Sequence, residues 1–525
     1  MKRGEIAASV SRGAFYLSLE RMAALVSGLV YFALLLRWLG PTKYGIMAIA
    51  LSFVGIVTLA TGNFEVFLER YAAEYKAQGR LRTLRRALRM SLALKLGLGL
   101  VAASVLAALA GPLAIQFEAP ELARLLPWFC LLVAFDGLST TGRSTLFGLQ
   151  RFRALFVTAI AFHVSKVILV AALWWARQGL LAFAIGLSLM TLVQGIALWS
   201  TAVWVLRGAE DEPSAEKLPS GMLLRTILGY AMPLFGARAM YNAGQNLVKI
   251  ILGKLFDATS VGYFSFAFQI IERFVELAHT VPLALLPSLT HLVARGERER
   301  LRSIFDQAFR LIQVAACVLS FVVFAFAREI TLFVASPLFE PAVAIVRIMA
   351  LVPMVRTAQQ PLAMLFQAMR RPGAVLWLAL LKFGLEFGSY VVFLPMFGIA
   401  GAAVANVLGA AGAYAAAHVM LNADFPEGAG ERTRAALLNP LWLAGALAAA
   451  WVASDVIGGT AGVVLRIALV PVVVVVIFAL RQVTRYDLYK LGTVPLRSAR
   501  VGRVRDRAVA AADRLAGLFE RMRPA

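Results

Sequence analysis

Residues 237–249, ARAMYNAGQNLVK, place charged and amide side chains inside a long apolar segment of the chain. These side chains follow the spacing i, i+4, i+7, i+8 and i+11, which is one face of an α-helix. The face consists of Arg238, Asn242, Gln245, Asn246 and Lys249. Arginine suits a phosphate or carboxylate, because its planar guanidinium can donate to two oxygens at once. The face therefore predicts a binding surface for an anion.

Similar polar groups recur in six other apolar segments. They are Gln269, Glu272, Arg273 and Glu276; Arg356, Gln359 and Gln360; Lys382 and Glu386; His163 and Lys166; Asp136, Thr140 and Ser144; and Glu20 and Arg21. A charge at the centre of a bilayer costs about 2.5–3.5 kcal/mol, so such residues should face protein or water. Local pairing, as in Glu272 with Arg273, Lys382 with Glu386 and Glu20 with Arg21, is one interpretation. The excess of basic residues favours a second interpretation, in which these groups line a hydrated cationic cavity for an anionic substrate. Lys95 and Lys249 could instead snorkel, with their ammonium groups at the membrane surface.

The composition requires that most of the chain lies in a membrane. Of 525 residues, 60% are hydrophobic and only 15% are charged, against about 45–50% and 25% in soluble proteins. No compact basic domain exists to carry a nucleic acid, and the four histidines lack metal-ligand spacing. Cys130 and Cys317 lie in apolar runs and are read as buried thiols.

About fourteen segments are long enough to span a bilayer. They are 14–38, 44–66, 88–112, 124–147, 155–175, 180–206, 227–251, 261–290, 309–334, 344–369, 374–394, 398–420, 438–456 and 462–480. With the N-terminus inside, 36 of the 52 lysines and arginines fall in inside segments and 8 in outside loops. This asymmetry predicts a multi-pass membrane protein with both termini cytoplasmic.

An internal repeat organises these segments. RWLGPTKYGIM at 37–47 aligns with KLFDATSVGYF at 254–264 at an offset of 217, and LFGLQR at 146–151 aligns with LFQAMR at 365–370 at 219. An offset of six helices predicts two parallel six-helix bundles. The predicted parts are an N-lobe (1–206), a cytoplasmic linker (207–226), a C-lobe (227–421), two further helices (438–480) and a basic tail (481–525). The tail is predicted to form an amphipathic helix on anionic lipids.

Two stretches resemble the bacterial polysaccharide and O-antigen flippases of the multidrug/oligosaccharidyl-lipid/polysaccharide exporter superfamily. They are LRWLGPTKYGIMAIALSFVGIVTLATGNFEVFLERYAAEYKAQG at 36–79 and LFQAMRRPGAVLWLALLKFGLEFGSYVVFLPMFGIAGAAVANVLG at 365–409. The resemblance implies an all-α, V-shaped transporter of the bacterial cytoplasmic (inner) membrane and no enzyme activity. It also implies a substrate, a polyprenyl-diphosphate-linked oligosaccharide moved between leaflets by alternating access for cell-surface polysaccharide synthesis. Polysaccharide polymerases and glycosyltransferases are the expected partners.

Under this resemblance, the polar residues take roles. Arg21 and Arg238, which the repeat relates, are expected to bind the diphosphate. Further basic candidates are Arg273, Arg356, Lys166 and Lys382, and the sugar candidates are Asn242, Gln245, Asn246, Gln359 and Gln360. Coupling to H⁺ or Na⁺ is assigned to Glu272, Glu276, Asp136 or Glu386, with no other cofactor and no metal. A lipid II flippase and a multidrug antiporter of the same superfamily remain alternatives.

Overall fold

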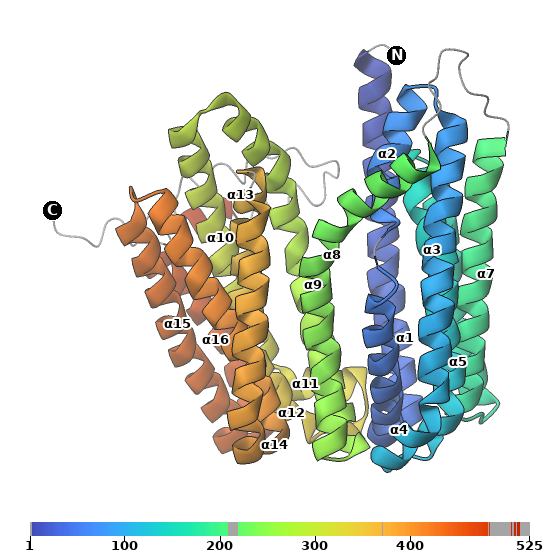
Figure 1. The fold of residues 1–525 in the computed structure, drawn as a ribbon. Helices are drawn as coiled ribbons and strands as arrows, with labels where there is room; N and C mark the ends of the chain where they lie inside the picture. Colours follow the sequence, from blue (N-terminus) through green and yellow to red (C-terminus); the bar gives the residue numbers. More distant parts are fainter. Residues whose placement is uncertain are drawn as a thin grey trace. The chain divides into compact units, whose positions relative to one another are not determined.

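The computed structural model is all-helical in the part of the chain that it describes (Figure 1). That part is residues 3–62, 64–207, 219–369 and 371–480, with a few positions beyond 481. Most of the predicted linker and the predicted amphipathic helix of the tail lie outside it. The chain divides into two compact units, one of residues 1–266 and 331–342 and the other of residues 267–330 and 343–525.

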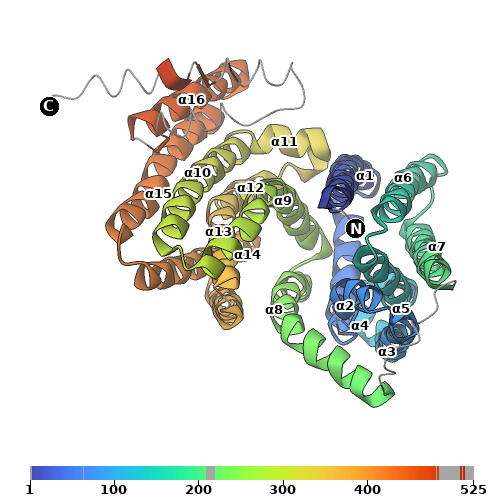
Figure 2. The ribbon, with the colours of Figure 1, turned by 90° about the horizontal axis from the view of Figure 1, so that it is seen from above.

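The first unit holds most of the helices from the first half of the chain. They are α1 (Arg3–Leu59), α2 (Val66–Ala77), α3 (Leu81–Ala108), α4 (Ala110–Gln116), α5 (Glu121–Gly148), α6 (Phe152–Trp175), α7 (Leu180–Arg207) and α8 (Ser220–Leu255). Within this unit α5 packs between α3 and α7, and α6 packs against α1 (Figure 2). A cluster of buried apolar side chains, which includes Phe67, Leu88, Leu146 and Leu198, joins α2, α3, α5 and α7.

The second unit holds the remaining helices, of which α9 begins in the first unit. They are α9 (Ala258–Arg295), α10 (Arg298–Ala325), α11 (Ala327–Val334), η1 (Pro337–Phe339), α12 (Ala342–Met349), α13 (Val352–Ala368), α14 (Pro372–Asp424), α15 (Ala429–Trp451), η2 (Val452–Ile457) and α16 (Gly459–Ala479). Of these, residues 331–334 of α11 and all of η1 lie in the first unit. Two buried clusters, one around Phe305 and Phe366 and one around Phe321 and Leu443, form the core of the second unit.

The helices account for the predicted spans. Ten described helical segments are long and apolar enough to cross a membrane. Two of them, α1 and α14, each contain a glycine with positive φ, Gly40 at 67° and Gly398 at 56°, that separates two predicted spans. The polar-striped α8 and α9, with 36 and 38 residues, are not among these ten, but each is a helix where the sequence predicts a span. Helices therefore lie at all fourteen predicted positions.

The repeat brings its own matched residues into contact within the first unit. The hydroxyl oxygens of Thr42 and Thr259, 217 residues apart, lie 2.8 Å from each other. A Cβ on Gly45 would overlap the carbonyl oxygen of Ala258, and one on Gly262 would overlap that of Pro41. Positions 41 and 258, and 45 and 262, are also 217 apart, so the contact is reciprocal. Such a contact is what a local two-fold relation between the two segments produces.

Candidate functional site

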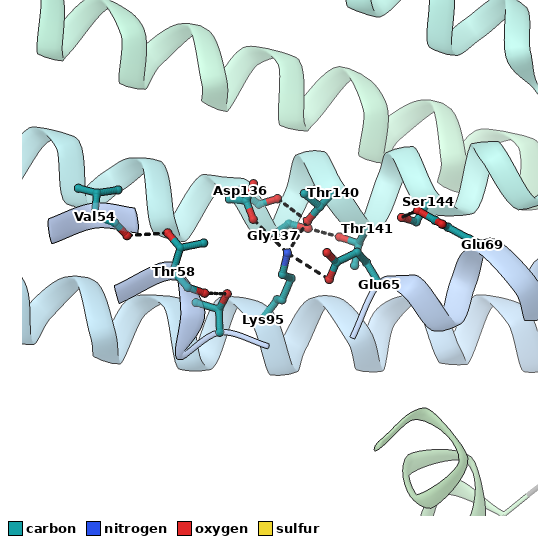
Figure 3. Close-up of polar contacts among 11 residues, drawn as sticks. Val54, Thr58, Glu65, Glu69, Lys95, Asp136, Gly137, Thr140, Thr141 and Ser144 are labelled. Atoms are coloured by element: carbon teal, nitrogen blue, oxygen red, sulfur yellow. Dashed lines mark hydrogen bonds and ion pairs between the residues drawn. The ribbon is translucent and has the colours of Figure 1, made fainter. Parts of the chain in front are cut away.

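A polar cluster surrounds the buried Lys95 in the first unit (Figure 3). Its ammonium group lies 3.1 Å from Glu65 Oε2, 3.0 Å from Asp136 Oδ2 and 2.8 Å from Thr140 Oγ1. The side chain is only 3% exposed, so Lys95 does not snorkel. With all groups ionised, one cation faces two carboxylates, and the cluster carries one net negative charge.

Three helices position this cluster. Glu65 stands at the N-terminal end of α2, Lys95 lies in the middle of α3, and Asp136 and Thr140 lie one turn apart on α5. Further along α5, Ser144 donates to Glu69 of α2 at 3.1 Å. The polar face predicted on residues 136–144 therefore meets two acids of α2.

The first half of α1 contributes an acid and a base that do not pair with each other. Glu20 is buried and its Oε1 lies 2.7 Å from Arg143 Nη2 of α5, so the predicted local pairing of Glu20 with Arg21 is wrong. Arg21 is exposed and makes no ion pair with any residue that the structure describes. The ammonium of Lys166 on α6 lies 5.2 Å from the ring centre of Tyr31 and 4.8 Å from that of Phe162, a cation–π arrangement.

The polar face predicted at residues 238–249 lies on α8. Asn242 is exposed, Gln245 and Asn246 are partly buried, and the Asn246 amide donates to the carbonyl oxygen of Asn242 at 2.8 Å. The Asn246 amide also lies close to Gly55 of α1. The side chain of Arg238 lies outside the described part of the structure, so its proposed role stays a prediction.

In the second unit the basic side chains of α13 and α9 meet acids of α9. Both guanidinium nitrogens Nη1 and Nη2 of Arg356 contact the Glu272 carboxylate, with Nη2 at 3.3 Å from Oε2. Arg273 Nη1 lies 2.9 Å from Glu276 Oε2. Glu272 therefore pairs with an arginine 84 residues away, and its predicted pairing with Arg273 is wrong. Gln359 and Gln360, on the turn after Arg356, are partly buried.

A second lysine–carboxylate cluster lies within α14. Lys382 Nζ is 2.5 Å from Glu386 Oε2, which confirms the predicted pairing of these residues one turn apart. The other carboxylate oxygen accepts hydrogen bonds from Tyr390 Oη at 2.7 Å and Asn406 Nδ2 at 2.6 Å. Asn406 comes from the part of α14 beyond the Gly398 kink, so the kink folds the second predicted span back onto the buried acid.

The sequence located many of these groups but not their partners. Spacing along one helix identified Asp136 with Thr140 and Lys382 with Glu386. Glu65, Arg143 and Asn406 were not singled out, because each reaches its partner from another helix or from beyond a kink. Among the described residues no group of three or more histidines, cysteines or acids could hold a metal ion, and both cysteines are buried and free.

Two family profiles match long parts of the sequence. The sequence profile of the polysaccharide biosynthesis protein family matches residues 10–293, and the MatE profile matches residues 233–392. No curated protein matches the sequence.

Solved membrane transporters share the fold. The lipid II flippase MurJ in an inward closed conformation aligns with a TM-score of 0.64 at 13% identity, over 88% of this chain and 98% of the other. An inward-facing multidrug resistance MATE family transporter of the MOP superfamily gives 0.62 at 16%, over 81% and 98%. The Vibrio cholerae MATE transporter VcmN in its bent form gives 0.53 at 14%, over 83% and 99%.

The fold class predicted from the sequence, an all-α polytopic membrane protein of the transporter type, is thereby confirmed. The family profile covers more than half of the 525 residues. The chain belongs to the polysaccharide biosynthesis protein family.

Proposed function

We propose that this protein is a flippase that moves a polyprenyl-diphosphate-linked oligosaccharide across the bacterial inner membrane by alternating access. Family membership supports a role in polysaccharide synthesis. The fold shared with a lipid II flippase supports a lipid-linked substrate. Both termini would then lie in the cytoplasm, and the substrate would reach the outer leaflet for surface polysaccharide assembly.

The observation that carries the proposal is an arginine inside a spanning helix that no carboxylate of the described residues neutralises. Arg21 lies on the first half of α1, exposed and without an ion pair among the described residues. Lys166, on α6, lies against the rings of Tyr31 and Phe162. A diphosphate would supply the missing negative charge, because phosphate oxygens accept charge-assisted hydrogen bonds from such groups. Arg238, Arg273, Arg356 and Lys382 are the further basic candidates, and the amides of α8 and α13 are the candidates for the sugar.

Coupling to H⁺ is proposed at the acids held beside lysines. In both clusters an ammonium group already stands beside the carboxylates, at Lys95 and at Lys382. Asp136 and Glu386 are therefore the first candidates, and Glu272 and Glu276, which contact arginines, are the next. A Na⁺-coupled mechanism predicts Na⁺-dependent transport, which distinguishes the two.

The test is leaflet translocation in proteoliposomes loaded with a fluorescent polyprenyl-diphosphate sugar. We expect wild-type protein to move the lipid, and the Arg21→Ala/Arg238→Ala variant to lose at least tenfold in rate, which corresponds to about 1.4 kcal/mol. Arg298→Ala, an exposed arginine at the start of α10, is the matched control and should keep the wild-type rate.

The outcomes separate the alternatives. A double variant with the wild-type rate would rule out the two arginines as diphosphate ligands. Translocation of lipid II in preference to other polyprenyl-diphosphate sugars would assign the protein to the lipid II substrate, which the fold shared with MurJ favours. Drug efflux without lipid translocation would favour the multidrug antiporter, an alternative that the MatE profile match supports.

A further inference from the structure

A cavity at one end of the first unit is separate from the polar clusters described above. Its volume is about 720 Å³, and it is bounded by α1, the turn between α5 and α6, α6 itself and the last turns of α7. Figure 2 shows α6 beside α1 and α7, and contacts join α6 to both. Its walls include Arg151, Arg153, Tyr16, Trp204 and Val157.

The walls are divided between charge and apolar surface. Arg151 and Arg153 are exposed, and neither makes an ion pair or hydrogen bond through its side chain with any residue that the structure describes. Trp204 is 71% exposed and Val157 is 55% exposed. By the predicted topology, this turn lies at the cytoplasmic end of the spans, where a tryptophan fits the membrane interface. The cavity thus combines an exposed apolar wall with two cations that have no side-chain partner among the described residues.

The repeat provides an internal comparison. The turn before α6 is closed by a hydrogen bond from Arg151 N to Leu146 O, and the turn before α14 by one from Arg371 N to Phe366 O, both 2.8 Å long. The offset is 220 residues. In the second half, Arg371 Nη1 contacts both carboxylate oxygens of Asp424, at 2.7 and 2.6 Å.

Asp424 has no acidic counterpart in the first half. It corresponds to Trp204 at the offset of 220 and to Val205 at the offset of 219 of the sequence alignment. The first half therefore keeps the arginine and has an apolar side chain in place of its carboxylate partner, and among the described residues no carboxylate neutralises Arg151.

The two threonine hydroxyls of the cavity are already used by the protein. Thr158 Oγ1 donates to Ala154 O at 2.9 Å, and Thr201 Oγ1 donates to Ala197 O at 2.7 Å. Tyr16 and Gln150 add neutral polar groups to the lining, and the charged donors are the two arginines. Two charged donors beside an apolar wall suit a phosphodiester that carries acyl chains.

We infer that this cavity binds an anionic phospholipid, with the phosphodiester on Arg151 and Arg153 and the acyl chains against Val157 and Trp204. Two cations can neutralise one phosphate and the second charge of a diphosphatidyl lipid. This site is independent of the proposed transport substrate, and its occupancy can be measured without transport.

The experiment is native mass spectrometry of the full-length protein after exchange into detergent with phosphatidylglycerol or phosphatidylcholine. We expect wild-type protein to retain one phosphatidylglycerol more strongly than phosphatidylcholine, by at least tenfold. Arg151→Gln/Arg153→Gln should lose that preference, while the control Arg225→Gln/Arg298→Gln, two exposed arginines outside the cavity, should keep it. Equal phosphatidylglycerol retention by the cavity variant and the wild type would overturn the inference.

Two further arms identify the ligand and guard against a folding defect. Val157→Trp fills the cavity and keeps both charges, so it should also lose the bound lipid, and full retention would place the lipid elsewhere. Millimolar inorganic phosphate should not displace the lipid, because the acyl chains hold it. Displacement by free phosphate, or tighter retention of a polyprenyl diphosphate than of phosphatidylglycerol, would contradict a phospholipid site.

Discussion

At the scale of single residues, the buried charges described above are neutralised by nearby partners, on other helices for Lys95 and Arg356 and on the same helix for Lys382. Lys95 meets two carboxylates, Arg356 meets Glu272, and Lys382 meets Glu386. A buried ion without its partner is costly, since its hydration is lost and nothing replaces it. Each of these contacts is therefore a site where one substitution should have a large effect, and where a second can reverse it.

Replacement of Lys95 by methionine is expected to destabilise the protein by about 3–5 kcal/mol, because two carboxylates stay behind without a cation. The measurement is denaturant unfolding in detergent. The triple variant with Glu65→Gln and Asp136→Asn should regain most of that stability, since the acids become neutral. Lys43→Met, at an exposed position, is the control and should behave as wild type. A Lys95→Met protein as stable as the control would contradict a structural ion cluster.

Arg356 and Glu272 are expected to be coupled in a double-mutant cycle. The sum of the losses in unfolding free energy from the two single alanine variants should exceed the loss from the double variant. The difference, which is the interaction energy, should be about 0.5–3 kcal/mol. The readout is again the unfolding free energy in detergent. If the two substitutions are additive, the contact contributes nothing, and Arg356 becomes a stronger candidate for a purely substrate-binding role.

At the scale of the helices, glycines determine where helices bend and how closely they pack, and an N-cap residue determines where a helix begins. Gly40 and Gly398 divide α1 and α14 into two spans each. Gly45 and Gly262 let the start of α9 approach α1 so closely that a side chain on either would overlap the opposite backbone. Asp257 begins α9 by accepting a hydrogen bond from the Ser260 backbone N–H at 2.8 Å, as N-cap residues do.

Gly45→Ala should destabilise the protein by about 1–3 kcal/mol, because the added methyl group has to push the Ala258 backbone away. Gly28→Ala is the matched control in the same helix, with nothing within 4 Å of the new Cβ. It should stabilise by about 0.5–1 kcal/mol through the lower entropy of the unfolded chain. Thermal unfolding of the two variants checks this, and equal effects would disprove the close approach.

Asp257 should make a pH-dependent contribution to stability. Partial burial works in the opposite direction, but hydrogen bonds from Ser260 and Thr259 lower the pKa of the Asp257 carboxyl overall. A pKa below the unfolded value means that the stabilisation is present above the ordinary aspartate pKa of about 3.9 and is lost as the pH falls through the lowered folded value.

Asp257→Ala should therefore cost about 1 kcal/mol near neutral pH. The difference in unfolding free energy between wild type and variant should become smaller in acid. The measurement is the difference between the two unfolding free energies from pH 7 to pH 3. A gap that is constant across this range would show that the cap acts without its charge.

At the scale of the whole molecule, the family match and the fold agree on a multi-pass membrane protein related to transporters. The orientation in the membrane and the boundaries of the two predicted lobes stay predictions. The two cysteines are buried, with exposures of 2% and 1%, which gives a low background for labelling single cysteines introduced elsewhere.

The predicted orientation can be tested with a membrane-impermeant maleimide on bacterial spheroplasts. Lys43→Cys, in a predicted outside loop, should react in intact spheroplasts. Gln78→Cys, in the predicted inside segment between α2 and α3, should react only after permeabilisation. Both positions are exposed. The reverse pattern would invert the topology and place both termini outside.

Sequence alone determined the properties that depend on composition and on order along the chain. Apolar runs, basic loops and the offset of 217 specified a membrane protein with about fourteen spans and an internal repeat. This works because transfer to lipid and positive charge bias act segment by segment. Spacing along one helix also predicted Lys382 with Glu386, since residues one turn apart are neighbours wherever the helix lies.

Only the tertiary structure decided which charges meet across helices. Local spacing suggested Glu20 with Arg21 and Glu272 with Arg273, but the structure pairs Glu20 with Arg143 and Glu272 with Arg356. The sequence left undecided whether Lys95 snorkels, and the structure encloses its ammonium group between α2 and α5. A buried ion takes the partner that packing brings within reach, and packing depends on helices far apart in the chain, which a one-dimensional pattern does not contain.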